Sequence, residues 1–175
     1  SGWSSCMNNL NTTLQNIGNN KDVQKAFIFI DDKLLIWLRN YTPDKWKNIS
    51  IWTVPGGRCG DNETMETTLR REVLEEVGID DLKIIEYLGS VPGAKEGDTV
   101  FVFKAETTQE PKLMEPKKFS EWKWCEISEI PSNFINSDAL KLIWDTLLFW
   151  FSVRLFEVIG FHLLPLLCKC RQPEN

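Results

Sequence analysis

Histidine is almost absent from this chain, because His162 is the only one in 175 residues. A zinc enzyme built on several histidines is therefore excluded, and a Ser-His-Asp triad would depend on this single residue. The cysteines offer no substitute, since they are scattered, odd in number and without metal-finger spacing. They are Cys6, Cys59, Cys125, Cys168 and Cys170. The available chemistry is thus narrowed to carboxylates.

An excess of positive charge is also lacking. The chain has 20 Lys and Arg against 25 Asp and Glu, a formal net charge of −5. Nucleic-acid polymers are bound chiefly through basic surfaces, so the charge argues against such a partner but not against small nucleotides. The start of the chain has no basic and apolar signal-peptide pattern, and the cysteines are typical of reduced thiols. We therefore expect a cytoplasmic protein.

The length is that of one domain large enough to bury a core. Residues 1–20 are rich in Ser, Asn, Thr and Gly, and we expect a flexible N-terminal segment there. Residues 21–152 are expected to form the domain. Residues 153–175 are expected to form an apolar C-terminal extension.

Several apolar stretches predict β-strands. Residues 25–30 and 33–38 are separated by Asp31-Asp32, which is typical of a hairpin turn. Residues 82–91 and 99–105 predict two longer strands. The polar residues 39–48 form a loop that is either part of a substrate pocket or an ordinary surface loop.

A helix is predicted over residues 65–77, after an apolar run and a Gly56-Gly57 turn. Thr64 is a good N-cap, and Gly78 stands where a left-handed C-cap would fall. At 3.6 residues per turn the helix has one apolar stripe that would face a core. The stripe consists of Met65, Leu69, Val73 and Val77.

Three acidic residues, Glu72, Glu75 and Glu76, crowd one corner of this helix. Like charges at this spacing destabilise a helix by roughly 0.2–0.5 kcal/mol per pair, so we expect something to compensate them. Carboxylate oxygens without imidazole or thiolate suit Mg²⁺, or Mn²⁺. For the Glu-Glu pair alone, a solvated helical face is the simpler interpretation. The complete pattern decides between the two.

The complete pattern spans residues 57–79. It reads Gly57, five residues, Glu63, seven residues, and then Arg71-Glu72-Val73-x-Glu75-Glu76-x-Gly78-Ile79. This resembles the box of the Nudix hydrolase superfamily, and every defining position is filled. One departure is Asn62, where the family very often has Gly, but Asn tolerates left-handed backbone better than most residues.

The resemblance implies an α/β fold, an α/β/α sandwich with a mixed β-sheet between helices. It also implies a hydrolase that uses Mg²⁺, with Mn²⁺ as a substitute. The metal ligands that it implies are Glu72, Glu75 and Glu76, and Glu75 and Glu76 would also act in catalysis. Glu63 and Arg71 would brace the box, and Gly57 would place backbone close to the metal and the phosphates.

A carboxylate outside the box often helps to hold metal or acts as general base in this family. The candidates here are Glu96, Asp98, Glu115 and Glu121. Charge and proximity to the box also make Arg58, Lys33 and Lys95 candidates for phosphate contact.

Residues 110–131 resemble a subset of the family in which a Glu-Pro segment precedes a Trp-x-Trp strand. Members of that subset look like nucleoside triphosphate pyrophosphohydrolases. Trp122 and Trp124 would share one strand face, where they either pack in the core or stack on a base. With Arg58 and Glu115 they are the candidate substrate-binding residues.

The sequence thus favours a nucleotide-binding hydrolase that cleaves nucleoside triphosphates, including oxidised ones, to the monophosphate and pyrophosphate. One alternative is a hydrolase of nucleotide sugars or other nucleoside diphosphate conjugates. The other is a non-catalytic nucleotide-binding module, against which the intact acidic residues speak.

From residue 138 the pattern is helical and apolar. The side chains able to face the core are Leu140, Ile143, Trp144, Leu147 and Phe151. Residues 149–167 are apolar nearly all round, but Arg154 and Glu157 interrupt them, and a central Arg costs about 2.5–3.5 kcal/mol in a bilayer. A homodimerisation helix is favoured over a membrane-associating tail and over a tail from altered coding sequence.

Overall fold

The structure is a computed structural model that describes residues 2–40 and 50–146, with side chains from residue 9 onward. The predictions made for the loop at 41–48, for Leu147 and Phe151, and for the apolar residues 149–167 lie outside the described residues. Within the described ranges, no helix combines the length and the apolar character that a membrane crossing requires.

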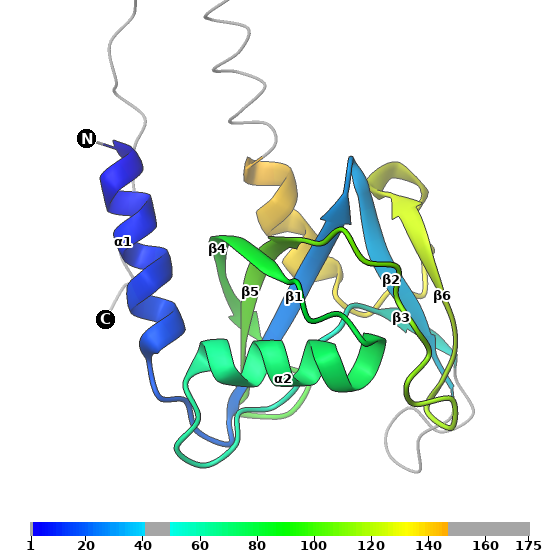
Figure 1. Cartoon of the computed structure of the whole chain (residues 1–175), viewed down its shortest axis with the longest axis horizontal. Helices are drawn as coiled ribbons and strands as arrows, with labels where there is room; N and C mark the ends of the chain where they lie inside the picture. Colours follow the sequence, from blue (N-terminus) through cyan, green and yellow to red (C-terminus); the bar gives the residue numbers. More distant parts are fainter. Residues whose placement is uncertain (1, 41–49, 147–175) are drawn as a thin grey trace, which may run out of the picture.

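Six β-strands form one mixed sheet at the centre of the molecule (Figure 1). They are β1 (Asp22–Ile30), β2 (Lys33–Arg39), β3 (Ile51–Thr53), β4 (Lys83–Pro92), β5 (Thr99–Glu106) and β6 (Phe119–Glu126). The order is β3-β2-β1-β5-β4, and β6 pairs with β2. β1 and β5 run parallel, whereas the other paired strands are antiparallel. The predicted strands and the β1-β2 hairpin are confirmed, with Asp31 in the left-handed region at φ 52°.

Helices cover both faces of this sheet, which confirms the α/β/α sandwich. Helix α2 (Met65–Val77) lies across one face with α1 (Gly2–Gln15) beside it, and a helix over residues 137–146 lies on the other (Figure 1). Each face has its own apolar cluster, because alternate residues of β1, β2 and β5 point to opposite sides. A short 3-10 helix, η1 (Ile127–Glu129), follows β6.

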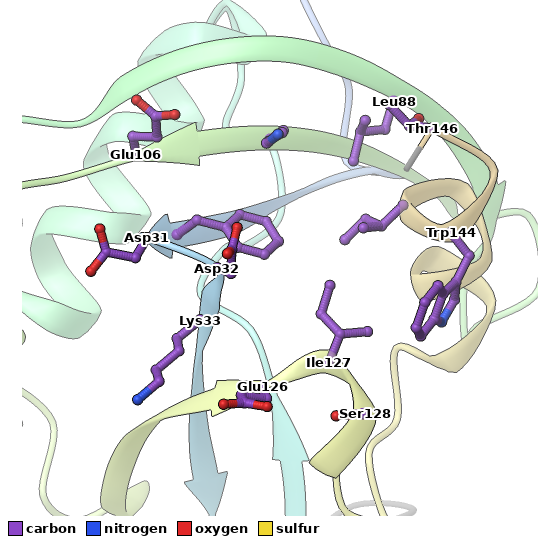
Figure 2. A pocket seen from close by; sticks show the side chains of 13 residues that line it. Asp31, Asp32, Lys33, Leu88, Glu106, Glu126, Ile127, Ser128, Trp144 and Thr146 are labelled. Carbon is purple, nitrogen blue, oxygen red and sulfur yellow. The ribbon is translucent and has the colours of Figure 1, made fainter. Parts of the chain in front are cut away.

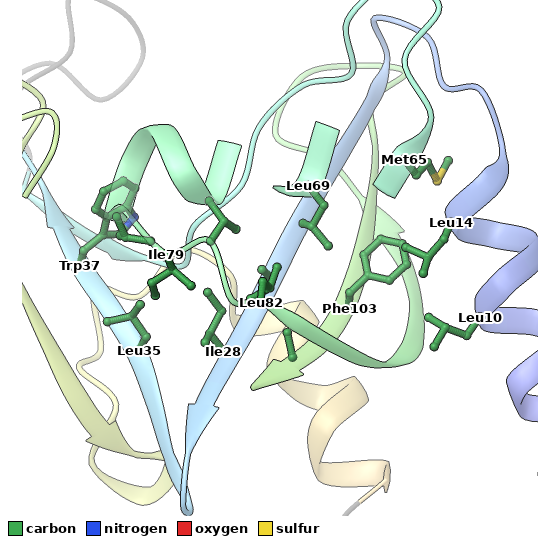
Figure 3. Close-up of a cluster of buried hydrophobic side chains, with 14 of the residues drawn as sticks. Leu10, Leu14, Ile28, Leu35, Trp37, Met65, Leu69, Ile79, Leu82 and Phe103 are labelled. Atoms are coloured by element: carbon green, nitrogen blue, oxygen red, sulfur yellow. The ribbon is translucent and has the colours of Figure 1, made fainter. Parts of the chain in front are cut away.

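The prediction of a flexible N-terminal segment is wrong where α1 docks. Leu10 and Leu14 are 5% and 6% exposed and lie in the cluster under α2, beside Phe103 and Met65 (Figure 3). They are four residues apart and therefore share one face of the helix. The segment is ordered by burial of these two side chains, which its polar composition conceals.

The structure places three of the tryptophans about which the sequence makes predictions. Trp122 and Trp124 share a strand face, as predicted, and both are partly buried against the cluster on the α2 side. Trp144 does not face the core, because it is 45% exposed, whereas Ala139 and Ile143 of the same helix are buried. The apolar face of helix 137–146 is thus rotated away from Trp144.

β1 and β2 separate beyond their hairpin, and the candidate site lies beside β1 where they have separated. The two strands pair only next to their hairpin, at Phe29–Leu34 and Ile30–Lys33. Further along, the segment after β3 takes the place of β2 beside β1: Ala26 N–H donates to Pro55 O and Gln24 N–H to Gly57 O, both at 2.9 Å. The Gly56-Gly57 turn is therefore fixed to β1, directly beneath α2.

Candidate active site

Helix α2 begins and ends where the sequence predicts. The Thr64 hydroxyl accepts the Thr67 N–H at 3.2 Å, and Gly78 has a left-handed φ of 68° while its N–H donates to Leu74 O at 3.0 Å. All four residues of the predicted apolar stripe are buried. The stripe fixes the rotation of the helix, so the acidic residues at its edge point towards the Gly56-Gly57 turn or into solvent.

Arg71 is the centre of an ion-pair cluster in the box. Its guanidinium forms two hydrogen bonds of 2.9 Å to the Glu63 carboxylate, and it also contacts Glu72 at 2.8 Å and Glu75 at 3.3 Å. The charge crowding on the helix is thus relieved in part by a cation of the chain itself. Glu75 is 58% exposed and extends along the helix surface towards Arg71.

Glu63 ties the loop before α2 to the helix. Besides Arg71, its carboxylate accepts the Gly60 N–H at 3.1 Å and the Thr68 hydroxyl at 2.8 Å. These hydrogen bonds, those from Arg71 and Thr68 above all, lower the pKa of Glu63 to about 2. Asn62 takes a left-handed φ of 62°, so it supports the loop shape as predicted.

Glu72 and Glu76 are the two box carboxylates that approach the Gly56-Gly57 turn. Glu76 Oε2 accepts the Gly56 N–H at 2.8 Å. The carboxylate of Glu72 lies so close to Gly57 that a Cβ there would meet its Oε1 at 2.6 Å. Gly57 is therefore required by the position of Glu72 rather than by its own backbone angles.

The surroundings of Glu76 disturb its titration. Burial raises the pKa of Glu76 to about 7, although Lys25 and the Gly56 N–H oppose the rise. Glu72 and Glu115 add negative charge nearby and raise the pKa of Glu76 further. Glu115 precedes β6 in the chain and is thus brought to α2 by the fold.

Sequence reasoning missed two cationic side chains at this place, Lys25 of β1 and Arg39 at the end of β2. Burial lowers the pKa of Lys25, with Glu76 and Glu72 opposing the shift and Arg39 adding to it. Arg39 Nε is buried and has no hydrogen-bond partner among the described residues. A signal was present, because Lys25 stands directly before the apolar run at residues 26–30.

Gln24, the neighbour of Lys25 on β1, also has buried polar atoms without a hydrogen-bond partner. Its side chain is fully buried, and neither amide atom has a partner within the part of the chain that the structure describes. A buried amide normally forms hydrogen bonds, so this side chain is an exception among buried polar groups.

Other predicted site residues lie elsewhere. Asp98 is buried and forms a two-point salt bridge with Arg58, at 2.9 and 2.5 Å, so each neutralises the other. Glu96 and Lys95 are exposed in the same loop. Glu121 is exposed on β6, on the opposite face from Trp122. Of the four carboxylates proposed from outside the box, only Glu115 approaches Glu76.

A pocket of 810 Å³ lies away from these residues, at the β1-β2 hairpin (Figure 2). Lys33 is part of its lining, together with Asp31, Glu126 and Trp144, and no residue of the box contributes. Lys33 therefore lies at the end of β1 and β2 opposite to the Gly56-Gly57 turn, and is not placed to contact a phosphate there.

The donor set near the turn fits a hard divalent cation. Glu72, Glu76 and Glu115 offer carboxylate oxygens, and the turn offers backbone carbonyls, which are the ligands that Mg²⁺ and Mn²⁺ take. In the described residues, however, no three such acidic, cysteine or histidine side chains converge closely enough to form a ready metal cluster. Cation binding would need small movements of carboxylates that now pair with Arg71 or lie near Lys25.

Comparison with known proteins gives a consistent result. A family profile described as the NUDIX domain matches residues 23–143. A MutT NUDIX hydrolase from Burkholderia pseudomallei is 20% identical, with 71% of this chain and 97% of that chain covered and a TM-score of 0.53. An Ap4A hydrolase from C. elegans is 20% identical, with 74% and 98% covered and a TM-score of 0.56. An ADP-ribose pyrophosphatase from Streptococcus suis is 19% identical, with 65% and 78% covered and a TM-score of 0.52.

Proposed function

Because the chain belongs to the Nudix family, we propose that it is a metal-dependent pyrophosphohydrolase that cleaves nucleoside triphosphates, oxidised ones included, to the monophosphate and pyrophosphate. The observation that carries the proposal is the placement of Glu72 and Glu76 against the Gly56-Gly57 turn, with Glu115 nearby. These carboxylates come from two separate parts of the chain, and a merely solvated helical face would not gather them.

Charge neutralisation is the main task of such a site. The oxygens of a pyrophosphate linkage repel a nucleophile, and a divalent cation bound here would neutralise them and lower the pKa of a water molecule. Glu72 and Glu76 would hold that cation. The Arg71 guanidinium donates a hydrogen bond to Glu72 and so holds its carboxylate in position. Glu63 accepts a hydrogen bond from the same guanidinium and so fixes Arg71.

Arg39 is our candidate for a direct phosphate contact, since its buried Nε lacks a partner in the described part of the chain. Guanidinium groups suit phosphate because they donate several hydrogen bonds in one plane. Arg58 fits this role poorly, because Asp98 already takes its charge.

We assign the proton acceptor outside the box to Glu115. Its side chain is 30% exposed, and its negative charge helps to raise the pKa of Glu76. A carboxylate in that position can accept a proton from an attacking water molecule. Lys118 pairs with Glu115 at 2.6 Å and so helps to hold the carboxylate in place.

The substrate class is tested by a panel assay with magnesium. The panel contains nucleoside triphosphates, oxidised nucleotides, nucleotide sugars and dinucleoside polyphosphates, and the products are separated by chromatography. The proposal expects monophosphate and pyrophosphate from triphosphates as the fastest reaction. Preferred cleavage of a nucleotide sugar would replace the substrate class, and binding without turnover would favour the non-catalytic module.

A further inference from the structure

Lys25 is a charged residue that neither the box pattern nor the proposed hydrolysis uses. It lies on β1 between the buried residues Gln24 and Ala26 and is itself only partly exposed. Its Nζ donates to two backbone carbonyls of the segment before α2, Val54 O at 3.2 Å and Gly56 O at 3.4 Å. A half-buried lysine at the start of the apolar run 26–30, with its ammonium directed at this turn, requires an explanation.

Gly56 connects Lys25 to the box. Its carbonyl accepts the Lys25 ammonium, and its N–H donates to Glu76 Oε2 at 2.8 Å. The ammonium and the Glu76 carboxylate thus bind the two sides of one residue. Glu76 and Glu72 are also the two acidic groups whose charges act on Lys25, and Arg39 is the cation that opposes them.

The four defining carboxylates of the box each therefore lie near a cation of the chain itself. Glu63, Glu72 and Glu75 contact Arg71, and Glu76 lies within the electrostatic influence of Lys25. A carboxylate removed from water without a neighbouring cation is strongly destabilised. The cations explain why four acidic side chains can remain together in this fold.

We propose that Lys25 is a built-in counter-cation of Glu72 and Glu76, which stabilises the metal-free site and weakens its affinity for a divalent cation. The proposal rests on the proposed function, because it takes these two carboxylates as metal ligands. A divalent cation must approach them against the charge of Lys25 and must share or replace its contact with Gly56 O. A lysine suits this role, since its flexible stem allows the ammonium to withdraw.

The size of the effect follows from Coulomb repulsion. At an effective dielectric constant of about 20, two unit charges roughly 10 Å apart still interact by more than the free energy of a tenfold change in affinity. Loss of the ammonium should therefore tighten Mn²⁺ binding by at least about tenfold.

The test is a titration of the full chain with Mn²⁺, followed by the electron paramagnetic resonance signal of the free ion. Lys25→Met removes the charge while keeping an unbranched side chain, and Lys33→Met is the matched control at the opposite end of the same strand pair. We expect at least tenfold tighter Mn²⁺ binding for Lys25→Met and no change for Lys33→Met. In chelator, Lys25→Met should also melt at a lower temperature than the wild type, and Mn²⁺ should raise its melting temperature more.

The contrary outcomes are separable. Equal or weaker Mn²⁺ binding by folded Lys25→Met overturns the counter-cation role and leaves the proposed function standing. Absence of Mn²⁺ binding in both proteins overturns the metal site of the proposed function as well.

If Lys25→Met does not fold, the wild-type chain provides a second measurement. The lysine Cε resonances are recorded by NMR during titration with Mg²⁺, and Lys25 is identified by the signal missing from Lys25→Arg. A shift of that signal that follows metal saturation supports the proposal. An unchanged Lys25 signal at saturation contradicts it.

Discussion

Alanine substitutions at Gly57 and at Gly56 should separate damage to the candidate site from damage to the fold. A Cβ at Gly57 would lie 2.6 Å from Glu72 Oε1, whereas an ordinary van der Waals contact begins at 3.4 Å. The Cδ and Oε2 of Glu72 lie closer still, so in Gly57→Ala the carboxylate must move by more than 0.8 Å. The obstructing atoms belong to the end of a flexible side chain, and Gly57 does not need a positive φ, so the fold should tolerate the change.

A displacement of about 1 Å in a catalytic group can cost about 100-fold in rate. We expect Gly57→Ala to lose about 100-fold in kcat/KM with magnesium while its melting temperature stays close to that of the wild type. Gly56→Ala should behave differently, because Gly56 has a φ of 138° and the added Cβ would lie 3.0 Å from the backbone carbon of Gln24. That variant should lose stability as well as activity.

The assay combines steady-state kinetics with thermal unfolding for both variants, and Gly97→Ala in the exposed β4-β5 loop serves as a control for a glycine with positive φ. Wild-type turnover by Gly57→Ala would refute the claim that Glu72 must stand where it does. Normal stability of Gly56→Ala would refute the close packing of the turn on β1.

Three further predictions concern Glu115, Glu63 and α1. Glu115→Gln should lower kcat by about 10²–10⁴-fold, because Glu115 is assigned as the proton acceptor. Glu121→Gln, on the other face of the sheet, should keep a kcat near that of the wild type. An equal kcat for the two variants would contradict the assignment of Glu115 as proton acceptor. The pKa of Glu63 is lowered to about 2 from 4.5, so its contribution to the free energy of unfolding is complete above pH 4.5 and is lost as the pH falls through 2. Urea unfolding between pH 7 and pH 2.5 should show this loss, and Glu63→Gln should flatten the profile; an unchanged profile would contradict the role of the Arg71 pair. Leu14→Ala should reduce the free energy of unfolding by about 2–5 kcal/mol, because Leu14 is buried against the core; a loss near zero would mean that α1 does not contribute to the domain.

The box and its helix could be predicted because their determinants are local. Thr64 and Gly78 mark the ends of α2, and the stripe of four apolar residues sets its buried face within thirteen residues. The hairpin of β1 and β2 is local in the same sense. In each case the residues that determine the structure are neighbours in the sequence.

What was not predicted depends on contacts between distant residues. Lys25 reaches Gly56 only because β1 separates from β2 and the segment at 55–58 takes its place. Asp98 forms a salt bridge with Arg58, forty residues away in the chain, so its charge is not available to a metal. The docking of α1 rests on two leucines in a polar segment, which composition alone describes as a flexible tail.

The most direct test of the account is magnesium-dependent release of pyrophosphate from nucleoside triphosphates by the wild type and by Glu76→Gln. Glu66→Gln is the matched control, because Glu66 lies on the same helix and pairs with Arg70, away from the turn. The account predicts turnover in the wild type and in Glu66→Gln, its loss in chelator, and its near-complete loss in a folded Glu76→Gln. Magnesium-dependent turnover at the wild-type rate in Glu76→Gln would contradict it.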